Sequence, residues 1–367
     1  MPKSLGSQKI GGTDFKRAWY SWNMKLSGLR IAITGGAGFI GSHLVDQLVQ
    51  YKNKIIVFDN FSTGSRENIA VHRSNPEVSI VDGDVRDLLS LERALESVDV
   101  LFHLATNCVR LSLSDPQTNH DVNATGTLNS LLAAKKKGVK RYVYCSSSEV
   151  YGDIQNSLTK SDHDKLTENS AKLPTTIYGA SKLVGEYYAL SFHKTYGLPA
   201  MVVRPFNAYG PRSYFSGPYG EVIPRFTMMV RAGRQPIIFG DGLQTRDFTY
   251  VEDTAAGLIA SAECDQLLGD NVNLAHGEEV SIVGLTHLLC ELHNVPYNPK
   301  HTSERPGEIR RLGADVSKAK KILSLESKTS IKDGLTRYLK WLDQQNLDYQ
   351  SIAKNLSEKN WTDPAKR

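Results

Sequence analysis

The regular alternation of two kinds of segment constrains the fold of this chain most strongly. From residue 29 onward, short runs rich in β-branched residues alternate with helix-like segments, such as LRIAITG, FIGSHLVDQLVQY and KIIVFDN. An order of strand, helix and strand is typical of βαβ units and predicts a parallel sheet with helices on both faces. Near residue 207 the alternation gives way to a stretch rich in Gly and Pro, GPRSYFSGPYGEVIPRF, which is followed by shorter and less regular elements.

We therefore expect an α/β fold in which a Rossmann-like doubly wound parallel sheet precedes a smaller, mixed C-terminal lobe. The sheet domain is predicted over residues 29–207 and the lobe over 208–342. The first 28 residues are polar and basic, and residues 343–367 are polar with weak periodicity. We expect the first segment to be an unfolded extension and the second to be a frayed tail.

Composition excludes several classes of protein. The net charge is +5, but the lysines and arginines are scattered and form no long basic block, so nucleic acid is not an expected partner. No apolar run approaches the roughly 18 residues of a membrane span, and the leader lacks the apolar centre of a signal peptide. The four cysteines lie far apart without a CxxC pair, which indicates neither a zinc site nor a disulfide framework. A cytoplasmic protein with reduced thiols fits these features best.

A glycine motif lies where the first predicted strand passes into the first predicted helix. In TGGAGFIGS, glycines 35, 38 and 41 follow the strand IAIT and open the helix FIGSHLVDQLV. Gly35 permits a tight turn, Gly38 lets the main chain approach a pyrophosphate, and Gly41 allows close packing of helix on strand. Because the helix N-terminus also favours negative charge, a dinucleotide is the expected ligand.

The end of the second strand indicates which dinucleotide binds. Asp59 stands at the expected distance of roughly 20 residues, can accept hydrogen bonds from both ribose hydroxyls and would repel a 2′-phosphate. NAD is therefore favoured over NADP, although the nearby Arg66 weakens this preference. Acidic residues after strands are also common in turns. The residues predicted to hold NAD are Gly35, Gly38, Phe39, Ile40, Gly41, Asp59, Asn60, Asp84, Val85, Leu104, Ala105, Tyr178 and Lys182.

A second motif, YGASK, places Tyr178 and Lys182 four residues apart and hence on one face of a helix. A nearby ammonium group and an oxidised nicotinamide would favour the phenolate and bring its pKa toward neutral pH. Taken alone, such a pair is more often a surface feature. It gains weight from the serine cluster of SSSEVYG, which ends the preceding strand, where open α/β sheets bind ligands.

Together these motifs resemble the extended short-chain dehydrogenase/reductase family, in the branch that modifies nucleotide sugars. The resemblance covers roughly residues 29–342 and is carried by TGGAGFIGSH, DNFSTG, HLA, VNATGTLN, SSSEVYG, YGASK, RPFNAYGPR, FGDGLQTRDFTYVED and ERPGE. It implies NAD as cofactor and a nucleotide sugar as substrate. It also implies that the sheet domain, 29–207, binds NAD and carries the catalytic residues, and that the lobe, 208–342, mainly binds the nucleotide sugar.

The resemblance also implies roles for single residues. Tyr178 matches the base that takes the proton of the sugar 4-hydroxyl, Lys182 its partner, and Ser147 the hydroxyl that bridges Tyr178 and substrate. Asn123 matches an asparagine that supports the hydrogen-bond network of the active site. Asn207, Arg246 and Arg305 match positions that bind the pyrophosphate of the nucleotide sugar. Without the resemblance, either arginine would be read as a surface residue.

Glu149 distinguishes the reactions within the branch. A 4-epimerase usually has a small or hydroxyl residue before VYG, whereas a carboxylate suits proton abstraction at C5 in a 4,6-dehydratase. We favour NDP-hexose 4,6-dehydration, although Ser148 stands where many dehydratases have an acidic Asp, and several flanking motifs also resemble epimerases. The alternatives are a 4-epimerase, a uronic acid decarboxylase, whose motifs are similar to SEVYG, and a non-catalytic dinucleotide sensor. Glu149 could also simply cap a local amide.

Two helix-like segments, 123–138 and 178–197, combine apolar stripes with polar faces. By analogy with the family, we expect them to pair in a homodimer as a four-helix interface. The same stripes could instead pack only on the sheet.

Overall fold

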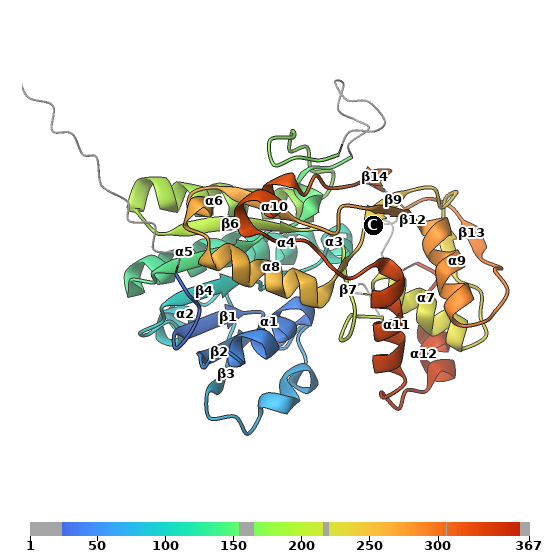
Figure 1. Ribbon diagram of the computed structural model, residues 1–367, viewed down its shortest axis with the longest axis horizontal. Coiled ribbons are helices and arrows are strands. Elements are labelled where there is room, and N and C mark those ends of the chain that lie inside the picture. Colours follow the sequence, from blue (N-terminus) through green and yellow to red (C-terminus); the bar gives the residue numbers. More distant parts are fainter. Residues whose placement is uncertain (1–23, 154–164, 216–219, 306, 360–367) are drawn as a thin grey trace, which may run out of the picture.

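The computed structural model describes residues 24–153, 165–215, 220–305 and 307–359 (Figure 1). A sheet of seven strands forms the larger part of the molecule, and each neighbouring pair of strands is parallel. The strand order is β11-β6-β5-β4-β1-β2-β3. The strands are β1 (Arg30–Thr34), β2 (Lys54–Asp59), β3 (Val78–Asp82), β4 (Val100–His103), β5 (Arg141–Cys145), β6 (Ala200–Pro205) and β11 (Asn271–Leu274).

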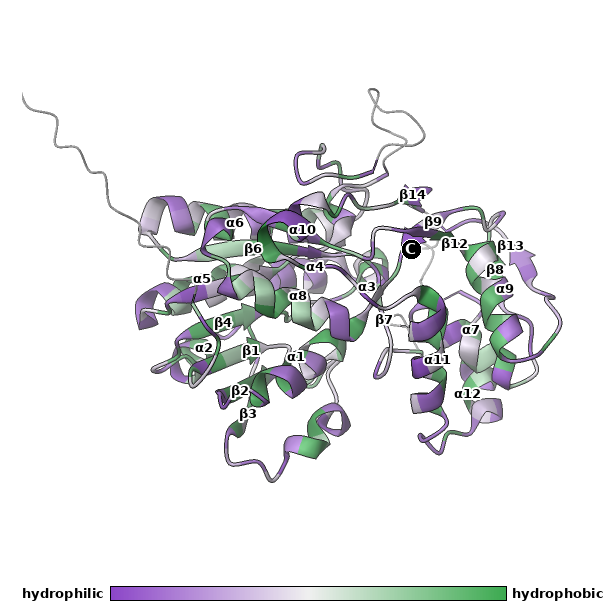
Figure 2. Ribbon diagram, viewed as in Figure 1, coloured by the Kyte–Doolittle hydropathy of each residue, from purple (hydrophilic) through white to green (hydrophobic). Residues whose placement is uncertain are grey.

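Helices cover both faces of this sheet, as expected for a parallel sheet whose strands are apolar on both sides. One apolar core joins one face to α1 (Phe39–Val49), α8 (Val251–Glu263) and α10 (Ser317–Leu323). A second core joins the other face to α2 (Leu88–Ala94), α5 (Gly126–Lys137) and α6 (Ile177–Tyr196). Polar residues lie along these helices, whereas the central strands are largely hydrophobic (Figure 2). The predicted fold class is confirmed.

The smaller lobe lies beyond the carboxyl ends of the strands (Figure 1). A third apolar core holds its helices together. The lobe also contains short strands in the orders β12-β9-β14, β13-β8 and β10-β7. Its helices are α7 (Val222–Arg231), α9 (Ile282–Leu292), α11 (Ile331–Leu342) and α12 (Tyr349–Asn355). Its strands are β7 (Ala208–Tyr209), β8 (Ile237–Phe239), β9 (Thr245–Asp247), β10 (Thr249–Tyr250), β12 (Glu279–Ser281), β13 (Lys300–Thr302) and β14 (Arg311–Leu312).

Short helical segments connect the larger elements near the carboxyl edge of the sheet. Two of them, α3 and α4, follow β4, and a π-helical turn, η2, leads from α4 into α5. A 3-10 turn, η3, begins three residues after the end of β5 and carries the SEV residues of SSSEVYG. The short segments are η1 (Arg66–His72), α3 (Val109–Ser114), α4 (Pro116–His120), η2 (Asp121–Thr125), η3 (Ser148–Val150) and η6 (Asp265–Leu267).

The chain does not divide cleanly at residue 207. Strand β11 pairs with β6 at the edge of the large sheet, and α8 packs against α1. Both elements come from the range 208–342, as does α10, so the chain returns twice from the lobe to the sheet before it completes the lobe. The sequence did not reveal the return at β11 because the strand NVNL is short and lies between turn-forming residues.

The expectations for the two ends of the chain are partly wrong. Leu26 is 1% exposed, and its N–H donates to Glu263 Oε1 over 2.9 Å, so residues 24–28 pack on α8. Helix α12 packs on α7 of the lobe. Ala353 in this helix is buried, and Leu356, which follows it, is buried in the core of the lobe. Apolar residues three or four positions apart give this tail a helical face despite its polar composition. Residues 1–23 and 360–367 lie outside the described residues.

No helix in the described ranges is both long enough and apolar enough to cross a membrane. Those ranges also contain no cluster of three or more His, Cys, Asp or Glu side chains arranged to hold a metal ion.

Candidate active site

A cavity of about 410 Å³ lies between the carboxyl edge of the large sheet and the smaller lobe. The loops after β1, β2, β3, β4, β5 and β6 line one side of it, and α7, β8 and β9 line the other. All thirteen residues predicted to hold NAD line this cavity, as do Ser147, Ser148, Glu149, Asn207, Arg246 and Arg305. Residues far apart in the sequence therefore converge at the edge where parallel α/β sheets bind ligands.

The glycine loop fits a dinucleotide because two of its positions have no room for a side chain. A Cβ at Gly41 would lie 2.2 Å from the Gly35 carbonyl oxygen. Gly35 has φ +71°, and a Cβ there would lie 2.8 Å from the Ala105 nitrogen. No side chain caps the N-terminus of α1, which therefore faces the cavity with its amides and its positive dipole end. This arrangement suits a pyrophosphate at the start of α1.

We expect Gly41→Ala to weaken binding of NAD. The added Cβ must push the loop away from α1, and overpacking of this kind costs about 1–3 kcal/mol. If that cost falls on the bound geometry, the affinity for NAD drops by about tenfold or more. The measurement is a fluorescence titration of the NAD-free protein. The control is Gly284→Ala in α9, where the nearest atom to an added Cβ is the Ser281 Oγ at 3.1 Å. Unchanged affinity for NAD in Gly41→Ala would contradict the proposed binding of the pyrophosphate by the glycine loop.

Asp59 is held at the end of β2 by backbone amides. Its carboxylate accepts from Ala37 N over 3.0 Å and from Phe61 N over 2.8 Å, while burial raises its pKa. Arg66, which weakened the preference for NAD, lies over the Phe61 ring and pairs with Asp82 at 3.0 Å. Its guanidinium is thus paired with Asp82, the residue opposite Asp59 in β3.

Side-chain hydrogen bonds at Asp84, just after β3, join the loop after β2 to the loop after β3. Asp84 pairs with Arg86 at 2.7 Å and accepts from Asn60 Nδ2 over 2.9 Å. The hydrogen bond from Arg86 is the main reason that the pKa of Asp84 falls to about 2. The loops after β2 and β3 are therefore linked directly beneath the predicted adenosine half of the site.

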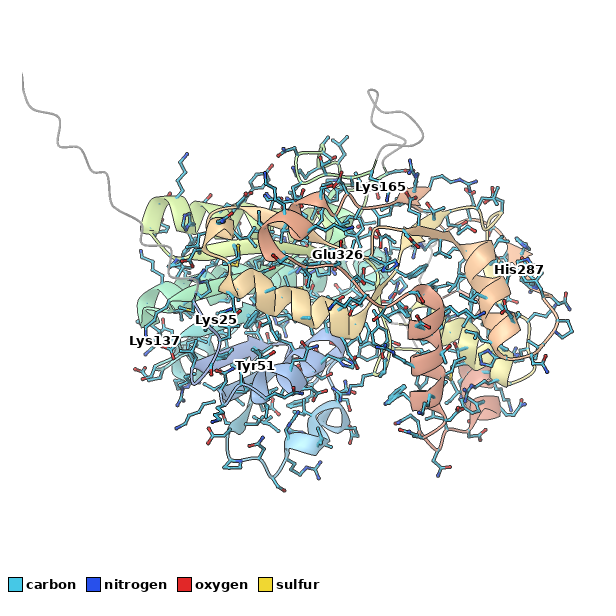
Figure 3. All side chains as sticks on the ribbon, viewed as in Figure 1. Lys25, Tyr51, Lys137, Lys165, His287 and Glu326 are labelled. Atoms are coloured by element: carbon cyan, nitrogen blue, oxygen red, sulfur yellow. The ribbon has the colours of Figure 1, made fainter. Side chains whose placement is uncertain are left out.

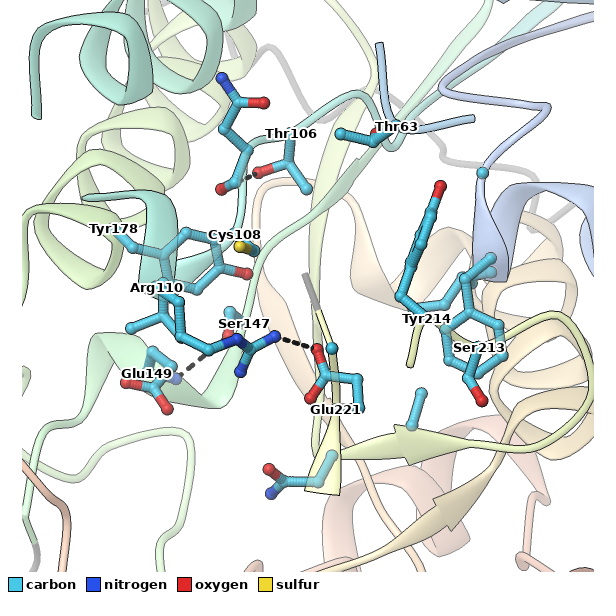
Figure 4. Close-up of a pocket in the computed structure, with 18 of the residues that line it drawn as sticks. Thr63, Thr106, Cys108, Arg110, Ser147, Glu149, Tyr178, Ser213, Tyr214 and Glu221 are labelled. Carbon is cyan, nitrogen blue, oxygen red and sulfur yellow. Dashed lines mark hydrogen bonds and ion pairs between the residues drawn. The ribbon is translucent and has the colours of Figure 1, made fainter. Parts of the chain in front are cut away.

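Tyr178 lies in the first turn of α6, with its hydroxyl directed into the cavity above the serine cluster (Figure 4). Burial raises the pKa of this phenol, and a hydrogen bond with the Ser147 side chain acts in the opposite direction. Lys182 donates to the Cys145 carbonyl over 2.6 Å, and burial lowers its pKa to about 8. Among the protein groups, burial and the nearby Glu149 carboxylate outweigh Ser147, so the pKa of Tyr178 is raised; the expected lowering, which involves an oxidised nicotinamide as well as Lys182, stays a prediction.

Asn123 lies behind the cavity rather than on its wall. Its Oδ1 accepts from Asn107 N over 2.7 Å and from Thr106 Oγ1 over 3.0 Å. Its Nδ2 donates to Ser181 Oγ over 3.2 Å. The side chain thus connects the loop after β4 to α6, where Tyr178 lies, which agrees with the supporting role that the resemblance implied.

Glu149 lies in η3, immediately after the serine cluster. Its own amide is capped by the Ser147 hydroxyl over 3.2 Å, so Ser147, not the Glu149 carboxylate, caps this turn. Burial is the largest influence on the Glu149 carboxyl and raises its pKa, while Arg246 and Arg305 oppose that effect. A partly buried carboxyl with a raised pKa is a suitable proton acceptor and donor near neutral pH.

Two predicted arginines meet a single carboxylate on the lobe side of the cavity. Arg246 Nη2 lies 2.5 Å from Glu308 Oε1, and Arg305 Nε lies 3.1 Å from Glu308 Oε2. Asn207 Nδ2 donates to the Asp247 carbonyl over 3.4 Å. The arginines and Asn207 all line the cavity, so they can meet an anionic group of the substrate there.

Sequence analysis missed an ion pair between Arg110 and Glu221. Arg110 Nη2 lies 2.5 Å from Glu221 Oε1, and both residues line the cavity beside Glu149 (Figure 4). Arg110 comes from α3 and Glu221 directly precedes α7, so the pair bridges the sheet domain and the lobe. A charged residue soon after HLA could have drawn attention to Arg110, because loops after parallel strands line ligand sites.

The fold and the cavity define a class of protein: the chain belongs to the NAD dependent epimerase/dehydratase family, whose model matches residues 31–275. It is 34% identical over 322 residues to a putative UDP-glucose 4-epimerase of Methanocaldococcus jannaschii, a match that covers 86% of this chain and 99% of the relative. It is also 34% identical to UDP-glucuronic acid decarboxylase 6 of Arabidopsis thaliana, over 84% of this chain and 87% of the relative. A dTDP-glucose 4,6-dehydratase of Streptomyces venezuelae, solved with NAD bound, superposes with a TM-score of 0.81 at 30% identity and covers 88% of this chain and 100% of its own.

These matches confirm the predicted family and cofactor. The protein is an NAD-dependent enzyme of the extended short-chain dehydrogenase/reductase type that modifies nucleotide sugars. Its relatives are named for epimerisation, decarboxylation and dehydration. The choice among these reactions therefore has to come from the chain's own residues.

Proposed function

We propose that the protein is an NDP-hexose 4,6-dehydratase. The observation that carries this proposal is Glu149, a carboxyl group with a raised pKa on the cavity wall that also holds Tyr178 and Ser147. An epimerase has no step that needs this carboxyl, because it returns the hydride to the same carbon. A dehydratase needs an acid or base at C5 and C6 of the sugar.

The first step is the oxidation of the sugar at C4. Ser147 orients the 4-hydroxyl toward Tyr178, which takes its proton. NAD, held by the residues of the glycine loop and by Asp59, would supply the hydride acceptor for C4 and the hydride donor for C6. Because burial raises the pKa of Tyr178, the phenolate requires a positive charge close to the phenol. Lys182, fixed by the Cys145 carbonyl one helical turn away, holds its amine on the same side of the cavity.

Glu149 carries the second step. Its carboxylate takes the acidic C5 proton of the 4-keto sugar, the C6–O bond breaks, and the same carboxyl group returns a proton to the departing oxygen, which leaves as water. Ser148 occupies the place of an acid and cannot itself supply a proton at neutral pH, so one carboxyl group serves both transfers. Reduction of C6 would then be accompanied by addition of a solvent-derived proton at C5.

The diphosphate of the substrate lies against Arg246, Arg305 and Asn207 in this proposal. Arginine suits this role because its planar fork matches phosphate oxygens and remains charged. Glu308 holds both arginines in place in the free protein and is available to be exchanged for the diphosphate.

The test is an incubation with a panel of UDP-, GDP-, dTDP- and CDP-hexoses in D₂O, followed by NMR of the sugar. We expect one member to yield a 4-keto-6-deoxy sugar with deuterium at C5, accompanied by the absorbance of the alkali-treated 4-keto product. A product that has lost no water would refute dehydration.

A second candidate is 4-epimerisation. Ser148 supports it, since the position lacks the acid that many dehydratases have, and the relative from M. jannaschii is named as an epimerase. Epimerisation would give an inverted C4 hydroxyl and no deuterium at C5. Release of CO₂ from a UDP-uronic acid would instead indicate decarboxylation.

The proposed homodimer predicts that a charge on the outer face of α6 separates the protomers. Tyr187 of α6 is 60% exposed and Leu132 of α5 is 40% exposed, and the two helices pack side by side. We expect Tyr187→Glu to convert a dimer to a monomer, because a charge buried in an interface without a partner is strongly unfavourable. Light scattering at dilute concentration measures this, with Tyr51→Glu, at a tyrosine that is 50% exposed outside these helices, as the control. A monomeric unsubstituted protein would refute the dimer.

A further inference from the structure

A fully buried ion pair lies beneath the catalytic residues. Arg204, in β6, is 1% exposed, and its guanidinium binds Glu186 of α6 through two parallel hydrogen bonds, Nε to Oε1 at 2.7 Å and Nη2 to Oε2 at 2.6 Å. Neither residue lines the cavity. Glu186 follows Tyr178 and Lys182 at intervals of four residues and therefore lies on the same face of the helix.

The pair also holds the two segments that carry the other catalytic groups. Ser146 donates to Glu186 Oε1 over 2.6 Å, and Ser146 directly precedes Ser147. Arg204 Nη1 donates to the Tyr151 hydroxyl over 2.7 Å, and Tyr151 follows Glu149 by two residues. One guanidinium is thus connected to α6, to the end of β5 and to the segment after η3.

The same network reaches the substrate-binding lobe. The Tyr151 hydroxyl donates to Asn273 Oδ1 in β11 over 2.7 Å, and Asn273 Nδ2 donates to the Leu166 carbonyl over 2.9 Å. Leu166 forms a bridge with Ala314, whose amide lies 3.4 Å from Asp247 Oδ2 in β9. Asp247 is the neighbour of Arg246, so the network ends one residue from a predicted substrate contact.

We propose that Arg204 is a positioning residue that holds Tyr178, Ser147 and Glu149 in one geometry through Glu186, Ser146 and Tyr151. A buried ion pair is often dispensable for stability, since well-packed apolar residues of similar volume can replace it. A displacement of about 1 Å in a reacting group, by contrast, can cost about 10²-fold in rate. The pair's value therefore lies in the alignment of the three segments that carry Tyr178, Ser147 and Glu149.

The test is the double variant Glu186→Met/Arg204→Met, which removes both charges and leaves no buried carboxylate alone. The probe is UDP-glucose or dTDP-glucose, whichever the unsubstituted protein oxidises faster, and the readout is reduction of the nicotinamide in a rapid-mixing experiment. We expect the rate of reduction to fall about 100-fold, with KM within about threefold and NAD binding unchanged. Arg204→Lys, which keeps the charge but not the fork, is expected to recover thermal stability without recovering the rate.

The matched control is Arg141→Met/Asp265→Leu, which removes a partly buried pair with a 2.7 Å contact at the opposite end of β5. We expect this control to reduce nicotinamide at the unsubstituted rate. If the Glu186/Arg204 double variant does not fold, Ser146→Ala/Tyr151→Phe removes the outer links while retaining the ion pair, and we expect a loss of about tenfold. An unchanged rate in a folded variant of either kind would overturn the proposal.

This inference rests on C4 oxidation, which the proposed dehydration shares with epimerisation and decarboxylation. Nicotinamide reduction by the unsubstituted protein without loss of water from the sugar would remove the dehydratase proposal and leave the role of Arg204 intact. Reduction at the unsubstituted rate in the folded double variant would remove the proposed role of Arg204 and leave the dehydratase proposal intact.

Discussion

Replacing Tyr178 with Phe is expected to lower turnover by about 10³-fold, because the phenol is the group placed to take the proton of the 4-hydroxyl. The ring itself packs in the wall of the cavity, and Phe retains that packing. Binding of NAD and of the nucleotide sugar should therefore stay within about threefold of the unsubstituted protein. Rapid-mixing measurement of nicotinamide reduction, together with titration of both ligands, checks each part.

The matched control lies on the same helix. Tyr196, in the last turn of α6, is 53% exposed and does not line the cavity. Tyr196→Phe should leave the rate unchanged. A normal rate of nicotinamide reduction in Tyr178→Phe would show that the phenol is not the base. The proposed active site on this wall of the cavity would then fail.

Ser147 acts on the same proton transfer, because its hydrogen bond lowers the pKa of Tyr178. In the proposed mechanism, further lowering comes from positive charge within the site, from Lys182 and from the oxidised nicotinamide when NAD is bound. Sequence spacing placed Tyr178 and Lys182 on one helix, as the structure has them, but could not reveal that burial raises the pKa of the phenol.

The features predicted well from the sequence are those set by neighbours along the chain. The glycine loop is one example: the strand before it, the helix after it and the lack of room at Gly35 and Gly41 are local consequences of the segment 31–49. The alternation of segments also fixed the parallel sheet, because each βαβ unit is a short-range pattern with one preferred handedness.

The features that the sequence did not reveal depend on contacts between distant segments. Arg110 and Glu221 are 111 positions apart, and nothing in either local pattern indicates that they pair. Strand β11 is four residues long, and only its pairing with β6 identifies it as part of the large sheet. The buried pair of Arg204 and Glu186 is similar, because charged residues in a strand and a helix would each be expected at the surface.

The nature of the second step depends on the environment of Glu149. Burial raises the pKa of its carboxyl group above the ordinary glutamate value of about 4.3. The base form is therefore populated only as the pH rises through this raised pKa, and dehydration should lose rate on the acidic side of it. We expect the acidic limb of the kcat profile to lie above the ordinary glutamate range and to follow C5 proton exchange rather than C4 oxidation.

Replacing Glu149 with Gln should then abolish the dehydrated product while nicotinamide reduction remains detectable. Gln has the same shape but neither accepts the C5 proton nor returns one to the departing oxygen, so a loss of about 10²–10⁴-fold in water elimination is expected. Deuterium incorporation at C5, followed by NMR in D₂O, measures the step directly, and the retained reduction of nicotinamide serves as the internal control for folding and binding.

Full production of a 4-keto-6-deoxy sugar by the Gln variant would exclude Glu149 as the acid and base. Loss of nicotinamide reduction along with elimination would instead place Glu149 in the first step, since the carboxyl group lies on the same cavity wall as Tyr178. Figure 3 shows the side chains of the described residues on the ribbon; among them, Glu149 is a carboxyl group on the cavity wall that also holds Tyr178.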